Sequence, residues 1–136
     1  MIGVVVVTHG QLATELLNAA EAIVGDLPRF AAVSIGWHDD VDDARDEIQR
    51  AIGRFQDGGG VLVLTDMFGG TPTNLSLGCL ETDKVEVVTG VNLPMLIKLA
   101  GLRESKDLLA VARELGETGR SAIHVASDLM RGEAKH

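Results

Sequence analysis

The sequence IGVVVVTHG occupies residues 2–10 and indicates how this chain folds. Its apolar run from Ile2 to Thr8, bounded by Gly10, predicts a buried strand. Residues 11–24 follow with apolar side chains at helical spacing and end at a glycine, which predicts a helix. A fully apolar strand that leads directly into an amphipathic helix is typical of a parallel sheet covered by helices.

The alternation of strand and helix continues along the chain. Further strands are predicted over residues 30–35, 61–65 and 85–89, and further helices over residues 41–52, 72–80, 92–99 and 105–117. A last strand is predicted from Ser121 to Ala126. This order predicts an α/β three-layer sandwich with a mostly parallel sheet of order 2-1-3-4. We expect one domain over residues 1–130 and a polar tail over residues 131–136.

Composition limits the class of protein. Hydrophobic residues make up 46% of the 136 residues and aromatic residues 3%, so the core must be aliphatic, as in sheets enclosed by helices. The formal net charge of -8, without a basic stripe, argues against nucleic-acid binding. The apolar residues 1–7 are too short to span a membrane and lack the basic segment of a signal peptide. We therefore expect a cytoplasmic protein that meets a membrane only indirectly.

The reactive side chains exclude two kinds of site. The single cysteine, Cys79, lies in an apolar helical stretch and excludes an internal disulfide or a multi-thiolate metal site. No spacing of histidine and carboxylate residues suggests a metal site either. The acidic residues 39–43 are better explained by their place at the positive end of a helix, which Asp39 or Asp40 can cap.

Two loops at the ends of predicted strands carry the residues with catalytic chemistry. His9 follows the first strand, and residues 66–74, with the sequence DMFGGTPTN, follow the strand that ends at Thr65. In the order 2-1-3-4 these strands are neighbours, about 5 Å apart. Ligands of open α/β sheets bind beyond the carboxyl ends of strands, where the strand order reverses. We therefore expect His9 and Asp66 to lie side by side in a functional site.

The chemistry of these residues suits phosphoryl transfer. A neutral imidazole nitrogen is a nucleophile towards phosphorus, and a carboxylate on the other ring nitrogen fixes the tautomer and supports the developing positive charge. Gly69, Gly70 and Thr71 open the next helix, where backbone N–H groups and the threonine hydroxyl can bind phosphoryl oxygens. We predict that His9 and Asp66 are catalytic and that the glycines and Thr71 bind the phosphoryl group, without a cofactor.

Each feature has an ordinary explanation when it stands alone. A histidine after a strand can be a loop residue, an aspartate there can be a turn residue, and Gly-Gly-Thr-Pro can be a turn before a helix. Their coincidence at neighbouring strand ends favours one site. His38 follows the second strand, and we expect it to be a surface residue that contacts a partner. His124 is expected to be structural, inside the last strand.

Three segments resemble the IIA component of the mannose family of the bacterial phosphoenolpyruvate:sugar phosphotransferase system. They are residues 2–10 (IGVVVVTHG), residues 64–74 (LTDMFGGTPTN) and residues 88–95 (VTGVNLPM). The resemblance implies a phosphocarrier that accepts a phosphoryl group on His9 from the phosphohistidine protein HPr and passes it to a IIB domain, which serves sugar uptake. It also implies that Asp66 orients the histidine and that Gly70 and Thr71 cradle the phosphate.

The resemblance further implies a four-stranded parallel sheet with a fifth, antiparallel edge strand exchanged between the subunits of a homodimer. Ser121 to Ala126 is the candidate for that strand. Phe68 and Thr71 stand where family members often carry Trp and Ser, which alters the fit to a partner, so Phe68 is a predicted partner contact. Because no IIB domain follows His136, we expect a separate IIB protein or a regulatory target as the acceptor.

Two other functions are open at this point. Thr8-His9-Gly10 loosely resembles the Arg-His-Gly of histidine phosphatases, but Thr8 replaces an arginine that such hydrolases need together with a second catalytic histidine. The other alternative is a regulatory binding module with the same fold that is never phosphorylated.

Overall fold

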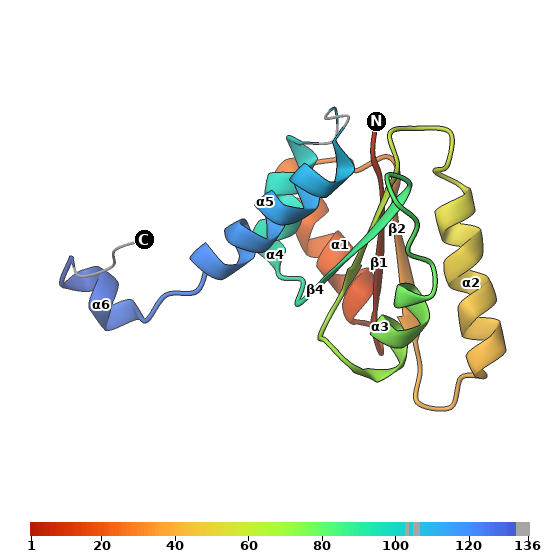
Figure 1. The fold of residues 1–136 in the computed structure, drawn as a ribbon. Helices are drawn as coiled ribbons and strands as arrows, with labels where there is room; N and C mark the ends of the chain where they lie inside the picture. Colours follow the sequence, from red (N-terminus) through yellow and green to blue (C-terminus); the bar gives the residue numbers. More distant parts are fainter. Residues whose placement is uncertain (103, 105–106, 133–136) are drawn as a thin grey trace.

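Strands and helices alternate in the computed structural model, which describes residues 1–102, 104 and 107–132 (Figure 1). The strands are β1 (Gly3–His9), β2 (Phe30–Ile35), β3 (Val61–Thr65) and β4 (Val85–Thr89). The helices are α1 (Leu12–Val24), α2 (Val41–Gly53), α3 (Gly70–Leu77), α4 (Leu93–Ala100), α5 (Leu108–Ser121) and α6 (Ala126–Met130). The four strands form one parallel sheet of order β2-β1-β3-β4, which confirms the predicted order 2-1-3-4.

Alternate side chains of the sheet build two hydrophobic cores, because successive residues of a strand point to opposite faces. Val4 and Val6 of β1 pack with side chains of α1, α4 and α5, such as Leu96. Val5 and Val7 pack with side chains of α2, and Leu75 of α3 packs against the same core. Figure 1 shows these two groups of helices on opposite sides of the sheet. The predicted three-layer α/β sandwich is confirmed.

The two strands that carry the site residues are neighbours at the centre of the sheet. β1 pairs with β2 on one side and with β3 on the other, and Val7 lies opposite Thr65. Every residue of β1 is buried except the last, His9. Both strands therefore deliver the residues that follow their buried parts to the same edge of the sheet.

The fifth strand, predicted from Ser121 to Ala126, is not formed, and the prediction is wrong for the single chain. Ser121 ends α5 and Ala126 begins α6, so only residues 122–125 lie between these helices, and His124 is among them rather than in a strand. Figure 1 shows this segment leading away from the sheet. A strand must pair its backbone groups with a neighbour, and β-propensity alone cannot supply that neighbour.

The helix predicted over residues 105–117 differs at both ends. Residues 105–106 lie outside the described part of the chain; Asp107 caps α5, and the helix begins at Leu108. It continues through Gly119 because that glycine is buried and its carbonyl oxygen accepts a hydrogen bond from Asn92 Nδ2 at 3.1 Å. Of the predicted tail, residues 131–132 form a turn and residues 133–136 lie outside the described residues. Within the described ranges, no helix is long and apolar enough to cross a membrane.

Candidate active site

His9 and Asp66 meet at the carboxyl edge of the sheet. His9 is the last residue of β1, and Asp66 directly follows β3. The ring nitrogen Nδ1 of His9 lies 2.8 Å from Oδ2 of Asp66, and the backbone N–H of His9 donates to the same oxygen at 3.0 Å. The carboxylate therefore holds both the backbone and the ring of the histidine, and the structure brings together the two residues that the sequence places at neighbouring strand ends.

This contact assigns different roles to the two ring nitrogens of His9. An ionised carboxylate can only accept hydrogen bonds, so the proton of the neutral ring is on Nδ1. The lone pair is then on Nε2, and a neutral histidine can attack as a nucleophile only through the ring nitrogen that carries the lone pair. The His9 side chain is 50% exposed and that of Asp66 only 13%, so the ring is accessible while the carboxylate that supports it is covered.

The pKa of Asp66 favours the ionised form. Partial burial pushes this pKa upwards, but the hydrogen bonds from the ring and the backbone N–H of His9, with the charge of His9, outweigh that effect. The net result is a pKa below the ordinary value for aspartate. The carboxylate is therefore ionised at neutral pH and can stabilise positive charge on the imidazole ring.

The loop before α3 brings backbone close to Nε2 of His9. Gly69 and Gly70 have φ angles of 92° and 83°, which side chains rarely adopt. A Cβ added at Gly70 would lie 3.1 Å from both Cε1 and Nε2 of His9. Gly69 is the N-cap residue of α3 and has no side chain to bond the first N–H groups of the helix. The helix start therefore offers donors to an anion next to Nε2, and Thr71 lies exposed in that turn.

Three buried threonines near the site were missed by the sequence reasoning. Thr8, Thr65 and Thr73 have fully buried side chains. Thr8 Oγ1 accepts a hydrogen bond from the backbone N–H of Ala13 at 2.7 Å and donates to the His9 carbonyl oxygen at 3.2 Å, which ties α1 to the end of β1. For Thr8 and Thr65 the available signal was a polar residue at the end of an apolar strand, directly before a predicted catalytic residue. Thr73 lies within α3 and carries no such signal.

The two predicted partner contacts lie in separate loops. The ring of His38 packs edge-on against Trp37, with 5.8 Å between ring centroids, in the loop after β2. Phe68 lies in the loop after β3 and is 76% exposed, and Trp37 is 91% exposed. Asp40 is the residue that caps α2, through the backbone N–H groups of its first turn. The aromatic side chains therefore follow the two strands that flank β1, and in the part of the chain that the structure describes no hydrogen bond or ring contact joins them to His9.

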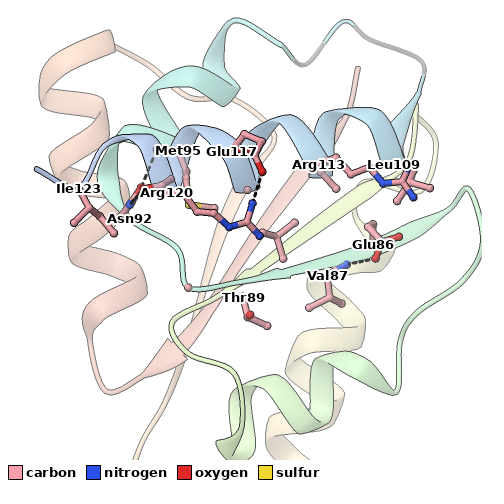
Figure 2. A pocket seen from close by; sticks show the side chains of 15 residues that line it. Glu86, Val87, Thr89, Asn92, Met95, Leu109, Arg113, Glu117, Arg120 and Ile123 are labelled. Atoms are coloured by element: carbon pink, nitrogen blue, oxygen red, sulfur yellow. Dashed lines mark hydrogen bonds and ion pairs between the residues drawn. The ribbon is translucent and has the colours of Figure 1, made fainter. Parts of the chain in front are cut away.

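A further hollow of the surface lies away from His9 and Asp66. It has a volume of about 770 Å³ and lies between β4, the edge strand of the sheet, and α5. Figure 2 shows Val87 and Thr89 of β4 on one side of this hollow and Arg113 and Arg120 of α5 on the other. Within the described part of the chain, no group of three or more His, Cys, Asp and Glu side chains is arranged to hold a metal ion.

Comparison with known proteins gives one consistent result. A family model described as "PTS system fructose IIA component" matches residues 3–115. The mannose-specific EIIAB component of Escherichia coli K12 is 33% identical over 132 residues, which cover 90% of this chain and 39% of that relative. The fructose-specific EIIA component of Bacillus subtilis 168 is 27% identical over 129 residues, covering 94% of this chain and 88% of the relative.

A solved structure agrees with the sequence comparisons. The crystal structure of phosphotransferase system component EIIA from Streptococcus agalactiae matches with a TM-score of 0.84 at 29% identity, covering 93% of this chain and 98% of that one. The chain thus spans less than half the length of the E. coli relative and most of the B. subtilis and S. agalactiae proteins.

Proposed function

This chain belongs to the mannose/fructose IIA family of the phosphotransferase system, and from that membership we propose that it is a phosphocarrier in sugar uptake that carries the phosphoryl group on His9. The observation that carries the proposal is the 2.8 Å contact between Nδ1 of His9 and Asp66. It leaves the lone pair of Nε2 free on an exposed ring. The donor in this proposal is the phosphohistidine protein HPr.

The transfer proceeds by attack of a nitrogen lone pair on phosphorus. Nε2 of His9 forms the new N–P bond, and the N–P bond of the donor breaks, so that its electron pair returns to the imidazole nitrogen of the donor. The proton on Nδ1 stays in its hydrogen bond with Asp66. Since the ring of His9 gains positive charge as the bond forms, the adjacent carboxylate lowers the energy of the phosphorylated state.

The start of α3 holds the phosphoryl oxygens. Negative charge is stabilised at a helix N-terminus, where backbone N–H groups lack partners within the helix. Gly70 supports this role, because only a residue without a side chain leaves the space beside Nε2 open. We assign phosphoryl binding to Gly69 and Gly70 at the start of the helix, and to Thr71, the exposed residue that follows them.

The acceptor in this proposal is a IIB protein, or a regulatory target in its place. The E. coli relative is named an EIIAB component, and the match to this chain covers 39% of it. Phe68 and His38, with Trp37, are proposed to contact the partner, since they are exposed aromatic side chains in the loops that follow β3 and β2. The cytoplasmic location expected from the sequence stays a prediction.

We also propose a homodimer in which residues 121–126 pair with β4 of the partner. The hollow between β4 and α5 supports this, because β4 has an unpaired edge within the described sheet. Ile123 and Val125, at 76% and 64% exposure, are apolar side chains that such pairing would cover. Light scattering should give the mass of a dimer for the wild type and a smaller mass for Val125→Asp; a monomeric wild type would contradict the exchange.

Phosphoryl transfer from HPr tests the main proposal. The wild type, His9→Ala and His124→Ala are each incubated with phosphoenolpyruvate, the enzyme that phosphorylates HPr, and HPr. We expect acid-labile phosphoprotein for the wild type and for His124→Ala, which is the matched control because it removes another exposed histidine, in the segment between α5 and α6. His9→Ala should remain unphosphorylated.

The same experiment separates the alternatives. Labelling of His9→Ala would exclude His9 as the carrier residue. Continuous release of inorganic phosphate by the wild type would favour the histidine phosphatase-like hydrolase. A wild type that binds a partner but never accepts phosphate would favour the unphosphorylated regulatory module.

A further inference from the structure

Two buried threonines, hydrogen-bonded to each other, join the ends of the loop that carries Asp66. Thr65 is the last residue of β3, and Thr73 lies in the first turns of α3. Their Oγ1 atoms are 2.8 Å apart, and Thr73 Oγ1 donates to the carbonyl oxygen of Met67. Both side chains are fully buried, so water cannot replace these hydrogen bonds.

The hydrogen bond between the two threonines can be donated by only one of them. A hydroxyl group has one proton and can accept as well as donate. Because Thr73 gives its proton to the Met67 carbonyl oxygen, the bond between the two threonines must be donated by Thr65. Thr65 is therefore a donor and Thr73 is both an acceptor and a donor, and a valine at either position cannot make these hydrogen bonds.

The peptide groups of Met67 connect Thr73 to Asp66, which in turn binds His9. The backbone N–H of Met67 donates to Oδ1 of Asp66 at 3.1 Å, while Oδ2 of the same carboxylate binds His9. One residue thus has its carbonyl oxygen held by Thr73 and its N–H group on the carboxylate. Thr73 also belongs to the helix that begins at Gly70, the glycine nearest to Nε2.

We propose that Thr73 is a positioning residue for phosphoryl transfer: by holding the Met67 carbonyl oxygen, it fixes the Asp66 carboxylate relative to the helix start that receives the phosphoryl group. This inference rests on the proposed function of His9. Thr73 touches neither the phosphoryl group nor the ring, so it acts through Asp66 and through the position of α3.

The test compares Thr73→Val with Ser76→Ala. Ser76 is the matched control, because it is a fully buried hydroxyl on the same helix that donates to Pro72 at 2.7 Å and has no link to the loop of Asp66. We expect Thr73→Val to lower the rate of phosphoryl acceptance from phosphorylated HPr about tenfold, the effect of one lost buried hydrogen bond. Ser76→Ala and Thr73→Ser, which restores the hydroxyl, should stay near the wild-type rate.

A second measurement distinguishes positioning from general loss of stability. Nitrogen-15 NMR of the His9 ring reports which nitrogen carries the proton, and we expect Thr73→Val, but not Ser76→Ala, to increase the share protonated on Nε2. If Thr73→Val does not fold, Thr73→Cys replaces it, because a thiol is only a weak donor. Equal rates and equal tautomer ratios in the valine or cysteine variant and Ser76→Ala would overturn the inference. A wild type that takes no phosphoryl group would refute the proposed function instead, and the tautomer ratio would then decide on Thr73 alone.

Discussion

Replacement of Gly70 by alanine tests the claim that backbone must lie directly beside the nucleophilic nitrogen of His9. The new Cβ would lie 3.1 Å from Cε1 and Nε2, at a φ of 83°. Carbon atoms in contact prefer about 3.5–4.0 Å, so the ring or the loop must move by about half an ångström. Misplacement of reacting atoms by up to about 1 Å can cost about a hundredfold in rate. We therefore expect Gly70→Ala to reduce phosphoryl acceptance about ten- to a hundredfold.

Gly90→Ala separates the steric effect from backbone strain. Gly90 has a φ of 84°, but a Cβ there would meet nothing within 4 Å. Each substitution should cost about 1–3 kcal/mol of stability through its unfavourable φ, which lowers Tm by roughly 3–10 °C. Transfer from phosphorylated HPr is measured at a temperature where circular dichroism shows both variants folded. Equal loss of rate in both variants, or no loss in Gly70→Ala, would refute the reasoning.

Three further predictions concern Asp66, Cys79 and the contact between α4 and α5. The pKa of Asp66 is lowered in the folded state, so its stabilising effect should be present above the ordinary pKa of about 3.9 and disappear as pH falls through the lower folded value. Urea unfolding of the wild type and Asp66→Asn at several pH values should therefore give free energies of unfolding that converge in acid. A difference that stays constant with pH would contradict this. A Cβ at Gly119 would lie 2.7 Å from Sδ of Met95, whereas a Cβ at Gly116 would make only ordinary van der Waals contacts. In thermal unfolding, Gly119→Ala should therefore destabilise the protein by about 1–3 kcal/mol, because the new methyl group overpacks the contact. Gly116→Ala should stabilise the protein by up to about 1 kcal/mol, because alanine has the higher helix propensity. Burial raises the pKa of the Cys79 thiol, and the charge of a nearby arginine offsets part of this effect. Iodoacetamide should therefore alkylate Cys79 more slowly than a model thiol at neutral pH. Equal rates would show that the thiol is not covered.

The sheet and the meeting of His9 with Asp66 could be predicted because they depend on short-range patterns. Four apolar runs separated by helical segments indicate parallel strands, and the carboxyl ends of such strands meet at one edge. His9 and Asp66 each stand directly after such a run, so their meeting requires only the strand order 2-1-3-4. The assignment of roles within the site remains a prediction that phosphoryl transfer must test.

The predicted strand from Ser121 to Ala126 fails for the opposite reason. β-propensity describes how well residues fit a sheet and supplies no neighbouring strand. In the single chain α5 continues to Ser121 and the next residues lead away from the sheet, so no ladder forms. Whether a second copy provides the neighbour depends on association, which local sequence patterns do not describe.

The sequence by itself determined the four strands of the sheet and the helices that follow them, the aliphatic core, and the edge of the sheet at which chemistry can occur. Only the tertiary structure decided that Nδ1 of His9 faces Asp66, which leaves the lone pair on Nε2, and that Thr73 Oγ1 bonds to the Met67 carbonyl oxygen beside that carboxylate. The reason is the range of the forces. Hydrophobic periodicity repeats over whole elements and is visible along the chain, whereas hydrogen bonds require atoms within about 3 Å in a defined direction, and that geometry exists only after the chain has folded.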